Sequence, residues 1–472
     1  MASPNGNVSR EGFIFGEFTA AIVALTLYMP NIVAAVISKH IAVALNIPKR
    51  NTGIYFSKLH STMSLVSLGC SSIVYVLKWI ISENNNSLAL VTYFFVWLSR
   101  LMLFLIMFRS DNMGLWFYGF MVLSAFSMGL FQMTFFSLTV YHVTTVGLTF
   151  RLSRLFVWLL QVILDITIPS RPLLMVKIHL FMILFTSTVA LCLWTYSCYK
   201  GLINAENGDI SSKESVVPEK KWKCTNAVKR NKKLSLTHLA EPSIYQHLGN
   251  ALSPLLMCFV PQVIRCFLYP SILPYSLLDR DLCHFTNMLI TPISVLGACL
   301  VHCLKLYVPS IGRRWTWHWN IFWVLAIPMV GILVCILSAL HGTDARLSKY
   351  CMDSIPAAST LVALLFSCSQ ILEALGYLGV AANVKHNGKM LNNGLKVVST
   401  NQFIFLILNV ISYKLSVGYC NTREKFVGSI PCYLPTNGMS LFSAFLFWFS
   451  GTVSNGYEDF LNEFNFNIRE YV

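Results

Sequence analysis

The ionisable residues of this chain that stand inside long apolar runs are the ones whose chemistry matters most. Arg100, Arg265 and Glu373 lie deepest in such runs, and Asp165 lies nearer the end of another. In an apolar surrounding each charge costs several kcal/mol unless it is paired or hydrated. Such residues therefore either join two helices as an ion pair or line a water-filled path. For Glu373 both interpretations stay open, with Arg265 or a solute as its expected partner.

Four further charged residues lie closer to the ends of their apolar runs. For Arg151 and Lys414 we expect the long side chains to extend to a polar boundary and leave only their stems in apolar surroundings. Glu17 and Arg154 are also expected near such a boundary. These residues are therefore not predicted to belong to a site.

The segment 370–384, "QILEALGYLGVAANV", surrounds Glu373 with small residues. Ala374, Gly376 and Gly379 are expected to form a close-packing face, because small residues let helix backbones approach one another. Elsewhere Gln132 places a neutral amide in the middle of an apolar run, where it can bond a ligand or a neighbouring helix. Prolines interrupt several runs and predict bent helices: Pro30, Pro254, Pro261, Pro292 and Pro328.

No catalytic constellation accompanies these residues. The chain contains no GxSxG, HExxH or phosphate-binding loop, so we predict neither an enzyme nor a cofactor. Cys299, His302 and Cys303 share a helix face, but further metal ligands are lacking there, and no metal site is predicted. A disulfide between Cys420 and Cys432 is suggested only by their proximity in the sequence.

The elements that position these residues must lie in a membrane. Of the 472 residues 55% are hydrophobic and 12% are charged, and the mean hydropathy is +0.61. A soluble protein carries about twice that charged fraction. Apolar runs recur along the chain, each long enough to cross a hydrocarbon core about 30 Å thick. Since backbone groups must be paired internally in lipid, and the runs are continuous, we predict helices rather than a barrel.

The apolar runs predict about eleven transmembrane helices in an all-α, polytopic protein with a 6+5 arrangement. They cover 13–38, 59–81, 88–108, 115–140, 148–168, 174–198, 248–272, 285–306, 318–340, 355–384 and 397–419. The predicted parts are a six-helix bundle at 1–199, a basic mobile loop at 200–247, a five-helix bundle at 248–420 and a tail at 421–472. The tail carries a short apolar segment, 438–453, which is marginal for a span.

Positive charge gives the predicted orientation. The loop 200–247 contains "PEKKWKC" and "KRNKK", and basic loops stay on the cytoplasmic side, so we expect this loop and the N-terminus there. The loop 39–58 opposes this trend. The same rule accounts for the net charge of +15 without a nucleic-acid partner. The expected location is a multi-pass protein of the plasma membrane with lipid as its surroundings; the sequence gives no oligomeric state.

Several stretches resemble the equilibrative nucleoside transporters, particularly their apicomplexan branch. "LTLYMPNIV" (25–33) is similar to the family's Leu-Pro-Trp-Asn turn without its tryptophan, and "GLFQMTFFSL" (129–138) to its Gly-x-x-Gln/Asn stretch. Residues 154–185 follow the family's alternation of apolar run, acid, proline loop and apolar run. "ALGYLGVAANVK" (374–385) resembles its Asn-Gly-Tyr motif, with leucine in place of asparagine.

The resemblance implies a major-facilitator-like, two-bundle transporter that moves nucleosides or nucleobases down their gradient by alternating access. It implies a substrate site that binds a base and a sugar, for which the candidates are Tyr28, Asn31, Arg100, Gln132, Arg265, Glu373 and Tyr377. One departure counts against this substrate. The family's eighth span recognises ribose with an Asp and an Arg, and this chain has Ser294 and Ala298 at those places.

Two alternatives to a nucleoside transporter remain. The chain would be a scaffold or pseudo-transporter if its buried charges all pair and no central cavity exists. It would carry another small solute, such as a drug, a sugar or an amino acid, if the same bundle holds a different site.

Overall fold

The computed structural model describes most of the chain. It covers residues 10–48, 51–80, 85–109, 111–139, 142–203, 243–269, 272–273, 277–278, 280–308, 315–341, 350, 354–383, 385–386, 389–390, 392–427, 435–436, 438–463 and 465. Most of the predicted basic loop, and Cys432, lie outside these residues.

The helices of the first half precede residue 204. They are α1 (Arg10–Leu27), α2 (Met29–Val36), α3 (Ser38–Ala44), α4 (Thr52–Ile80), α5 (Asn85–Leu105), the 3-10 helix η2 (Ile106–Phe108), α6 (Met113–Leu138), α7 (Val143–Thr167) and α8 (Pro172–Lys200). The second half holds α10 (Ile244–Asn250), α11 (Leu252–Leu268), α12 (Arg280–Tyr307), the 3-10 helix η5 (Trp317–Leu325), α13 (Ala326–Leu340), α15 (Ile355–Asn383), the strand pair β1 (Lys385–His386) and β2 (Lys389–Met390), α16 (Asn392–Val427) and α17 (Leu441–Leu461).

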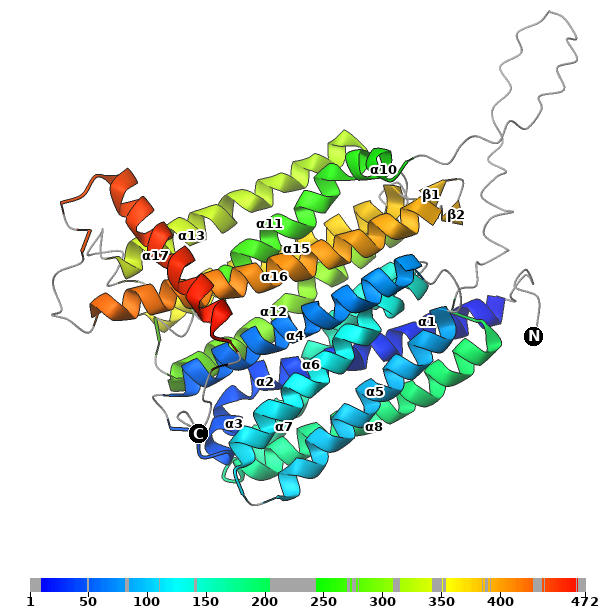
Figure 1. Ribbon diagram of the computed structural model, residues 1–472, viewed down its shortest axis with the longest axis horizontal. Coiled ribbons are helices and arrows are strands. Elements are labelled where there is room, and N and C mark those ends of the chain that lie inside the picture. The colour runs from blue at the N-terminus through cyan, green and yellow to red at the C-terminus, as the bar shows by residue number, and fades with distance from the viewer. Residues whose placement is uncertain are drawn as a thin grey trace, which may run out of the picture.

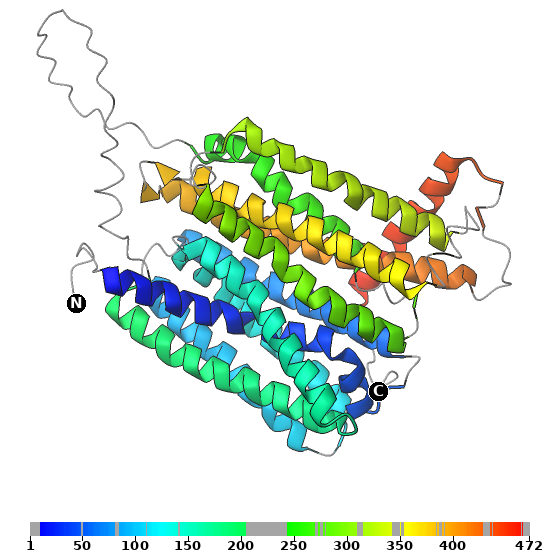
Figure 2. The ribbon, with the colours of Figure 1, turned by 180° about the vertical axis from the view of Figure 1, so that it is seen from behind.

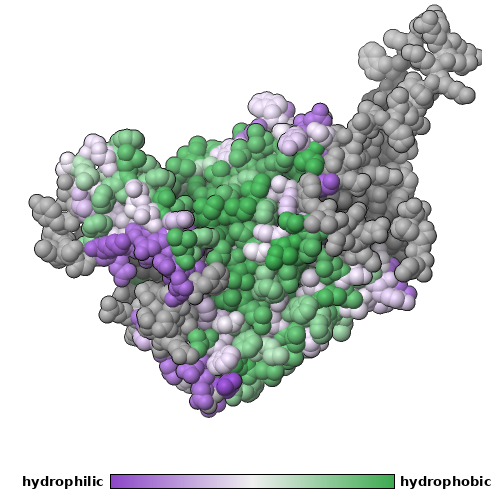
Figure 3. Space-filling view, in the orientation of Figure 1, coloured by the Kyte–Doolittle hydropathy of each residue, from purple (hydrophilic) through white to green (hydrophobic). Residues whose placement is uncertain are grey.

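The helices agree with the predicted transmembrane protein. Within the described residues, nine helices are long and apolar enough to cross a membrane, or up to eleven if each of two bent pairs is one span. The eleven predicted spans correspond to these helices and bent pairs. Large hydrophobic side chains cover the outside, and Figure 3 shows green residues across the middle of one face with purple residues toward its ends.

The first span of each half is bent. Helices α1 and α2 meet at Tyr28 with an angle of 40°, and α10 and α11 meet at Ala251 with an angle of 67°. Pro30 stands in the first turn of α2, where its missing N–H costs nothing, so the break follows from the sequence. Helix α10 begins at a capping box formed by Ser243 and Gln246, four residues before the predicted end of the loop.

The two halves form two groups of helices, and each group has a large hydrophobic core of its own. Helices α1–α8 lie together on one side in Figures 1 and 2, and α10–α16 lie on the other. One buried cluster joins α1, α5, α6, α7 and α8, and another joins α11, α12, α13, α15 and α16. The halves meet where α7 packs against α12 and α4 packs against α16.

The tail segment 438–453 forms part of one longer helix, α17, which is not among the helices that qualify as spans. Figure 1 shows α17 running obliquely across α16, at the end of the molecule opposite the start of α1. The helices approach closely at Gly418, where an added Cβ would lie 2.2 Å from the carbonyl oxygen of Thr452. Small residues therefore fix α17 onto α16.

Charged residues also fasten α17. Lys58 of α4, Lys414 of α16, Asp459 of α17 and Glu463 just beyond it form what we call the tail cluster. The Nζ atom of Lys414 lies 2.7 Å from Oδ2 of Asp459 and pairs with Glu463, while Lys58 pairs with Asp459. The prediction that Lys414 extends to the membrane surface is therefore wrong, because its ammonium group pairs with Asp459 on α17 and with Glu463 just beyond that helix.

Candidate functional site: a charged cavity between the halves

A cavity of about 350 Å³ lies between the two halves. Its walls come from both groups of helices: α2, α3, α4, α6 and α7 on one side, and α11, α12, α15 and α16 on the other. This volume is within the range of small-molecule sites. The scaffold alternative assumed that no central cavity exists, so this observation counts against it.

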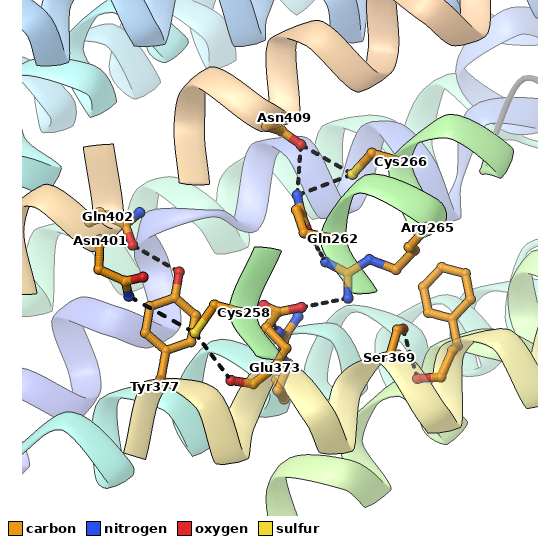
Figure 4. Close-up of polar contacts among 12 residues, drawn as sticks. Cys258, Gln262, Arg265, Cys266, Ser369, Glu373, Tyr377, Asn401, Gln402 and Asn409 are labelled. Atoms are coloured by element: carbon orange, nitrogen blue, oxygen red, sulfur yellow. Dashed lines mark hydrogen bonds and ion pairs between the residues drawn. The ribbon is translucent and has the colours of Figure 1, made fainter. Parts of the chain in front are cut away.

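Glu373 stands at the centre of the charged wall. Its Oε1 atom accepts a hydrogen bond of 2.6 Å from Arg151, and its Oε2 atom accepts one of 2.7 Å from Arg265. Arg151 belongs to α7 in the first half, whereas Arg265 belongs to α11 in the second. Figure 4 shows the contact between Glu373 and Arg265. One carboxylate on α15 therefore joins cationic groups from both halves.

Arg154 adds a second positive charge from α7 to the cavity. It lies one turn after Arg151, so both side chains leave the same face of the helix. We refer to Arg151, Arg154, Arg265 and Glu373 as the central cluster. The predictions for Arg151 and Arg154 were wrong, because the path between the halves offers these residues a polar surrounding inside the bundle.

Close packing fixes the position of Glu373. A Cβ added to Gly376 would lie 2.6 Å from Sγ of Cys258 and 2.7 Å from the carbonyl oxygen of Pro254. A Cβ at Gly379 would meet Trp315 and Pro254 at 2.5 and 2.7 Å. The predicted close-packing face is confirmed for both glycines, which seat α15 against α11. Ala374 instead lines the cavity.

Amide side chains support Arg265 on the side of the second half. Arg265 donates to Oε1 of Gln262, and Nε2 of Gln262 donates to Oδ1 of Asn409 at 2.8 Å (Figure 4). Tyr377, also on the cavity, donates to Oε1 of Gln402 at 3.0 Å. These bonds hold the guanidinium group and the phenol ring in fixed orientations, as a preorganised site requires.

The first half contributes Tyr28 and Asn31 to the cavity wall. The hydroxyl group of Tyr28 donates to Oε1 of Gln132 at 2.8 Å, and Nε2 of Gln132 donates to Ser71 at 3.1 Å. Gln132 is fully buried and is not among the lining residues. It therefore orients Tyr28 from behind rather than facing the cavity as expected.

Arg100 lies away from the cavity. Its Nη1 atom donates to Ser187 at 2.5 Å, and its Nη2 atom donates at 2.9 Å to the carbonyl oxygen of Leu27, the last residue of α1. A cation at the carbonyl end of a helix is favourable. Arg100 thus stabilises the bend between α1 and α2, and its prediction as a residue of the cavity wall was wrong.

Ser294 and Ala298 stand at the two positions that correspond to the ribose-binding residues of the nucleoside transporters, and neither side chain offers a free polar group to the cavity. Ser294 donates to the carbonyl oxygen of Thr291 at 2.7 Å and is fully buried. Ala298 lines the cavity but offers no polar atom. The polar surface comes instead from Asn31 and Asn409 and from the central cluster. Periodicity alone gives no signal for Arg151 and Arg154, since both stand near the start of their span.

The chain has the fold of the major facilitator superfamily. It matches the structure of a D-xylose–proton symporter with a TM-score of 0.54 and 11% identity, covering 94% of this chain and 96% of the symporter. A second structure is that of the major-facilitator proton:xylose symporter XylE bound to 6-bromo-6-deoxy-D-glucose. It matches with a TM-score of 0.54 and 8% identity over 96% of each chain. No sequence model of a protein family matches, and no curated protein matches by sequence.

At such low identity these likenesses concern the fold alone. The chain is a multi-pass membrane protein with this fold, and its helices enclose the cavity between two halves. The resemblance to nucleoside transporters stays a prediction.

Proposed function

We propose that this protein carries a small polar solute across its membrane by alternating access, down the gradient of the solute. The observation that carries the proposal is the bridge at Glu373, which binds an arginine from each half at 2.6 and 2.7 Å beside the cavity. A solute that binds Arg151 competes with this bridge and loosens the contact between the halves.

The separate hydrophobic cores support a rocking motion. Each half keeps its own buried cluster, so the six-helix part at 1–199 and the five-helix part at 248–420 can turn as units. The contacts between them include the polar pairs Arg151 with Glu373 and Asn409 with Ser64 at 3.4 Å, beside a small apolar cluster that joins α4 and α6 to α16. Polar contacts exchange for water or solute at lower cost than a packed apolar core.

A nucleoside or nucleobase is the first candidate solute. Aromatic rings of Tyr28, Tyr377 and Phe405 reach the cavity and can stack on a base, while Asn31 and Asn409 offer donors and acceptors. This candidate also rests on the resemblance of the segments around Asn31 and Tyr377. In this interpretation Tyr28, Asn31, Arg265, Glu373 and Tyr377 face the solute, and Gln132 orients Tyr28 from behind.

An anionic solute is the second candidate, and the charge of the cavity favours it. The wall contains Arg151, Arg154 and Arg265 but only Glu373 as an acid among the described lining residues, which leaves two positive charges unbalanced. Guanidinium groups bind phosphate and carboxylate groups in two-pronged contacts. A nucleoside monophosphate would satisfy both observations, because it combines an aromatic base with an anion.

The test is uptake into proteoliposomes of a labelled nucleoside and of the same nucleoside with a 5′-phosphate. Counterflow of either compound supports a carrier, and the ratio of the two rates separates the candidates. Glu373→Gln should lower flux, whereas Glu424→Gln, an acid-to-amide change at an exposed site on α16, should not. Absence of flux for both nucleoside forms, and for sugars and amino acids, would refute the transporter.

We also propose a plasma-membrane location with the N-terminus and the segment 200–247 in the cytoplasm. The excess of lysine and arginine in that segment supports this orientation. A protease added to the outside of sealed vesicles should cleave within 204–242 when the vesicles are inside-out, because their cytoplasmic face is then exposed. It should not cleave there in right-side-out vesicles.

A further inference from the structure

Three side chains that can bind a metal ion meet where α3 and the end of α7 lie against the start of α12, close to the cavity-lining Ser38 of α3. His40 comes from α3, Asp165 from the last turn of α7 and His284 from the first turns of α12. One ligand atom of each residue lies within 4.8 Å of the other two. The residues are separated widely in the sequence, so the fold alone brings them together.

The distances suit a shared ion. Nε2 of His40 lies 3.3 Å from Oδ1 of Asp165, and Nε2 of His284 lies 3.9 Å from Oδ2 of the same carboxylate. Zinc bonds to nitrogen and oxygen are about 2.0–2.2 Å, so two ligands of a tetrahedral ion stand about 3.4 Å apart. The first pair already has this spacing, and the second pair, to the other oxygen of the carboxylate, is about 0.5 Å wider.

The surroundings of these residues resemble those of a built site. Nε2 of Gln161 donates to Oδ1 of Asp165 at 2.7 Å, and His179 bonds to Oε1 of Gln161 at 2.9 Å. Hydrogen bonds to a carboxylate orient it as a metal ligand in proteins. Nδ1 of His284 is buried and has no hydrogen-bond partner in the part of the chain that is described, so its ring is held by no second bond.

We infer that His40, Asp165 and His284 bind a divalent transition-metal ion, for which zinc is the best match. Two imidazoles and one carboxylate are typical protein ligands of zinc, and water completes the tetrahedron. The side chain of Asp165 is 33% exposed, which gives an ion and its water a way in. This site is separate from the central cluster on the cavity wall.

A bound ion would join the two halves. His40 and Asp165 belong to the first half, and His284 belongs to the second, six residues before the cavity-lining Ile290. An ion that holds all three keeps the two halves from moving apart at this place, so zinc inhibits flux. This consequence rests on the proposed function, whereas binding itself does not.

The test of binding uses the purified full-length protein in detergent, stripped of metal with a chelator. Adding Zn²⁺ should raise its melting temperature, because a ligand that binds only the folded state stabilises it. Asp165→Asn, His40→Gln and His284→Gln should each abolish the rise. Gln161→Ala should weaken zinc affinity by about 10–100-fold, as is usual for residues that orient ligands. His318→Gln, at an exposed histidine, is the matched control and should keep the full rise.

Two results would overturn the inference: no zinc-dependent rise in the wild-type protein, or a rise that survives all three ligand substitutions. If a substituted protein does not fold, the absorption spectrum of Co²⁺ bound to the wild type decides. Bands of nitrogen- and oxygen-coordinated tetrahedral Co²⁺ that Zn²⁺ displaces support the site, and their absence refutes it.

Flux measurements then separate the site from the transport proposal. Zinc should slow counterflow in the wild type and leave the His284→Gln protein unaffected. A zinc-dependent rise in melting temperature without any flux would refute the transport proposal and leave the metal site standing. Flux that is insensitive to zinc, in a protein whose melting temperature rises, would refute only the inhibition of flux by zinc.

Discussion

The central cluster and the tail cluster contain the same number of charged residues but differ in balance. The tail cluster pairs Lys58 and Lys414 with Asp459 and Glu463, so its charges cancel. The central cluster sets three arginines against Glu373 and faces a cavity of about 350 Å³. A balanced, enclosed set of charges fastens helices, whereas an unbalanced set beside a cavity is suited to a ligand of opposite charge.

The largest expected effect is at the tail cluster. Lys414→Met leaves Asp459 and Glu463 buried with only Lys58, and the free energy of unfolding should fall by about 3–5 kcal/mol, because removing one partner strands a buried charge. Thermal unfolding in detergent measures this loss. Lys425→Met, at an exposed lysine of the same helix bonded to Asn455, should cost under about 1 kcal/mol. Equal losses for both lysines would contradict a fastening role.

The next effect concerns binding rather than stability. Arg151→Gln removes a charged hydrogen bond worth about 1.5–3 kcal/mol, so the half-saturating concentration of an anionic solute should rise about 10–100-fold. The melting temperature should change little, because Arg265 still pairs with Glu373. Arg171→Gln, at an exposed arginine, is the control for transport. A large fall in stability with unchanged flux would place Arg151 with the fastening residues.

Arg154 tests whether the excess positive charge of the cavity favours anion uptake even from a residue that makes no specific ion pair. No ion pair to Arg154 is present within the described ranges, so Arg154→Gln should weaken anion uptake less than Arg151→Gln does. Uptake of a neutral nucleoside should not change. The ratio of uptake of the phosphorylated to the neutral compound gives the result, and an equal change for both compounds would exclude a long-range charge effect.

The smallest expected effect is at the edge of the central cluster. Tyr28→Phe removes the bond to Gln132, which is worth about 0.5–1.5 kcal/mol, and keeps the aromatic ring. Flux should fall only a few-fold, and the loss should be the same for neutral and charged solutes. A loss confined to anions would show that Tyr28 acts on charge instead of on the ring of the solute.

The sequence predicts the helices better than it predicts which side chains meet. Apolar runs are long and continuous, so the spans and the bend at Pro30 follow directly from composition. The sequence also predicts that Glu373 lies near Arg265. It does not predict that Arg151 faces the cavity, because the distance of a residue from the end of a span does not tell whether its side chain faces lipid or a cavity.

The buried position of Lys414 and the meeting of His40 with His284 depend on packing between distant segments. The acids that bind Lys414 lie at and just beyond the end of α17, whose apolar segment is marginal for a span, so nothing local marks them as its partners. His40 and His284 come from different halves, and only the docking of α3 and α7 against α12 brings the two rings together.

The attachment of α17 also sets an order of events during synthesis. Lys58 and Asp459 are 401 residues apart. Because chains are synthesised at about 5–20 residues per second, Lys58 is added to the chain roughly 20–80 s before Asp459. During that interval α4 is already made while Asp459 is not. The pair between Lys58 and Asp459 can therefore form only after α17 has been synthesised.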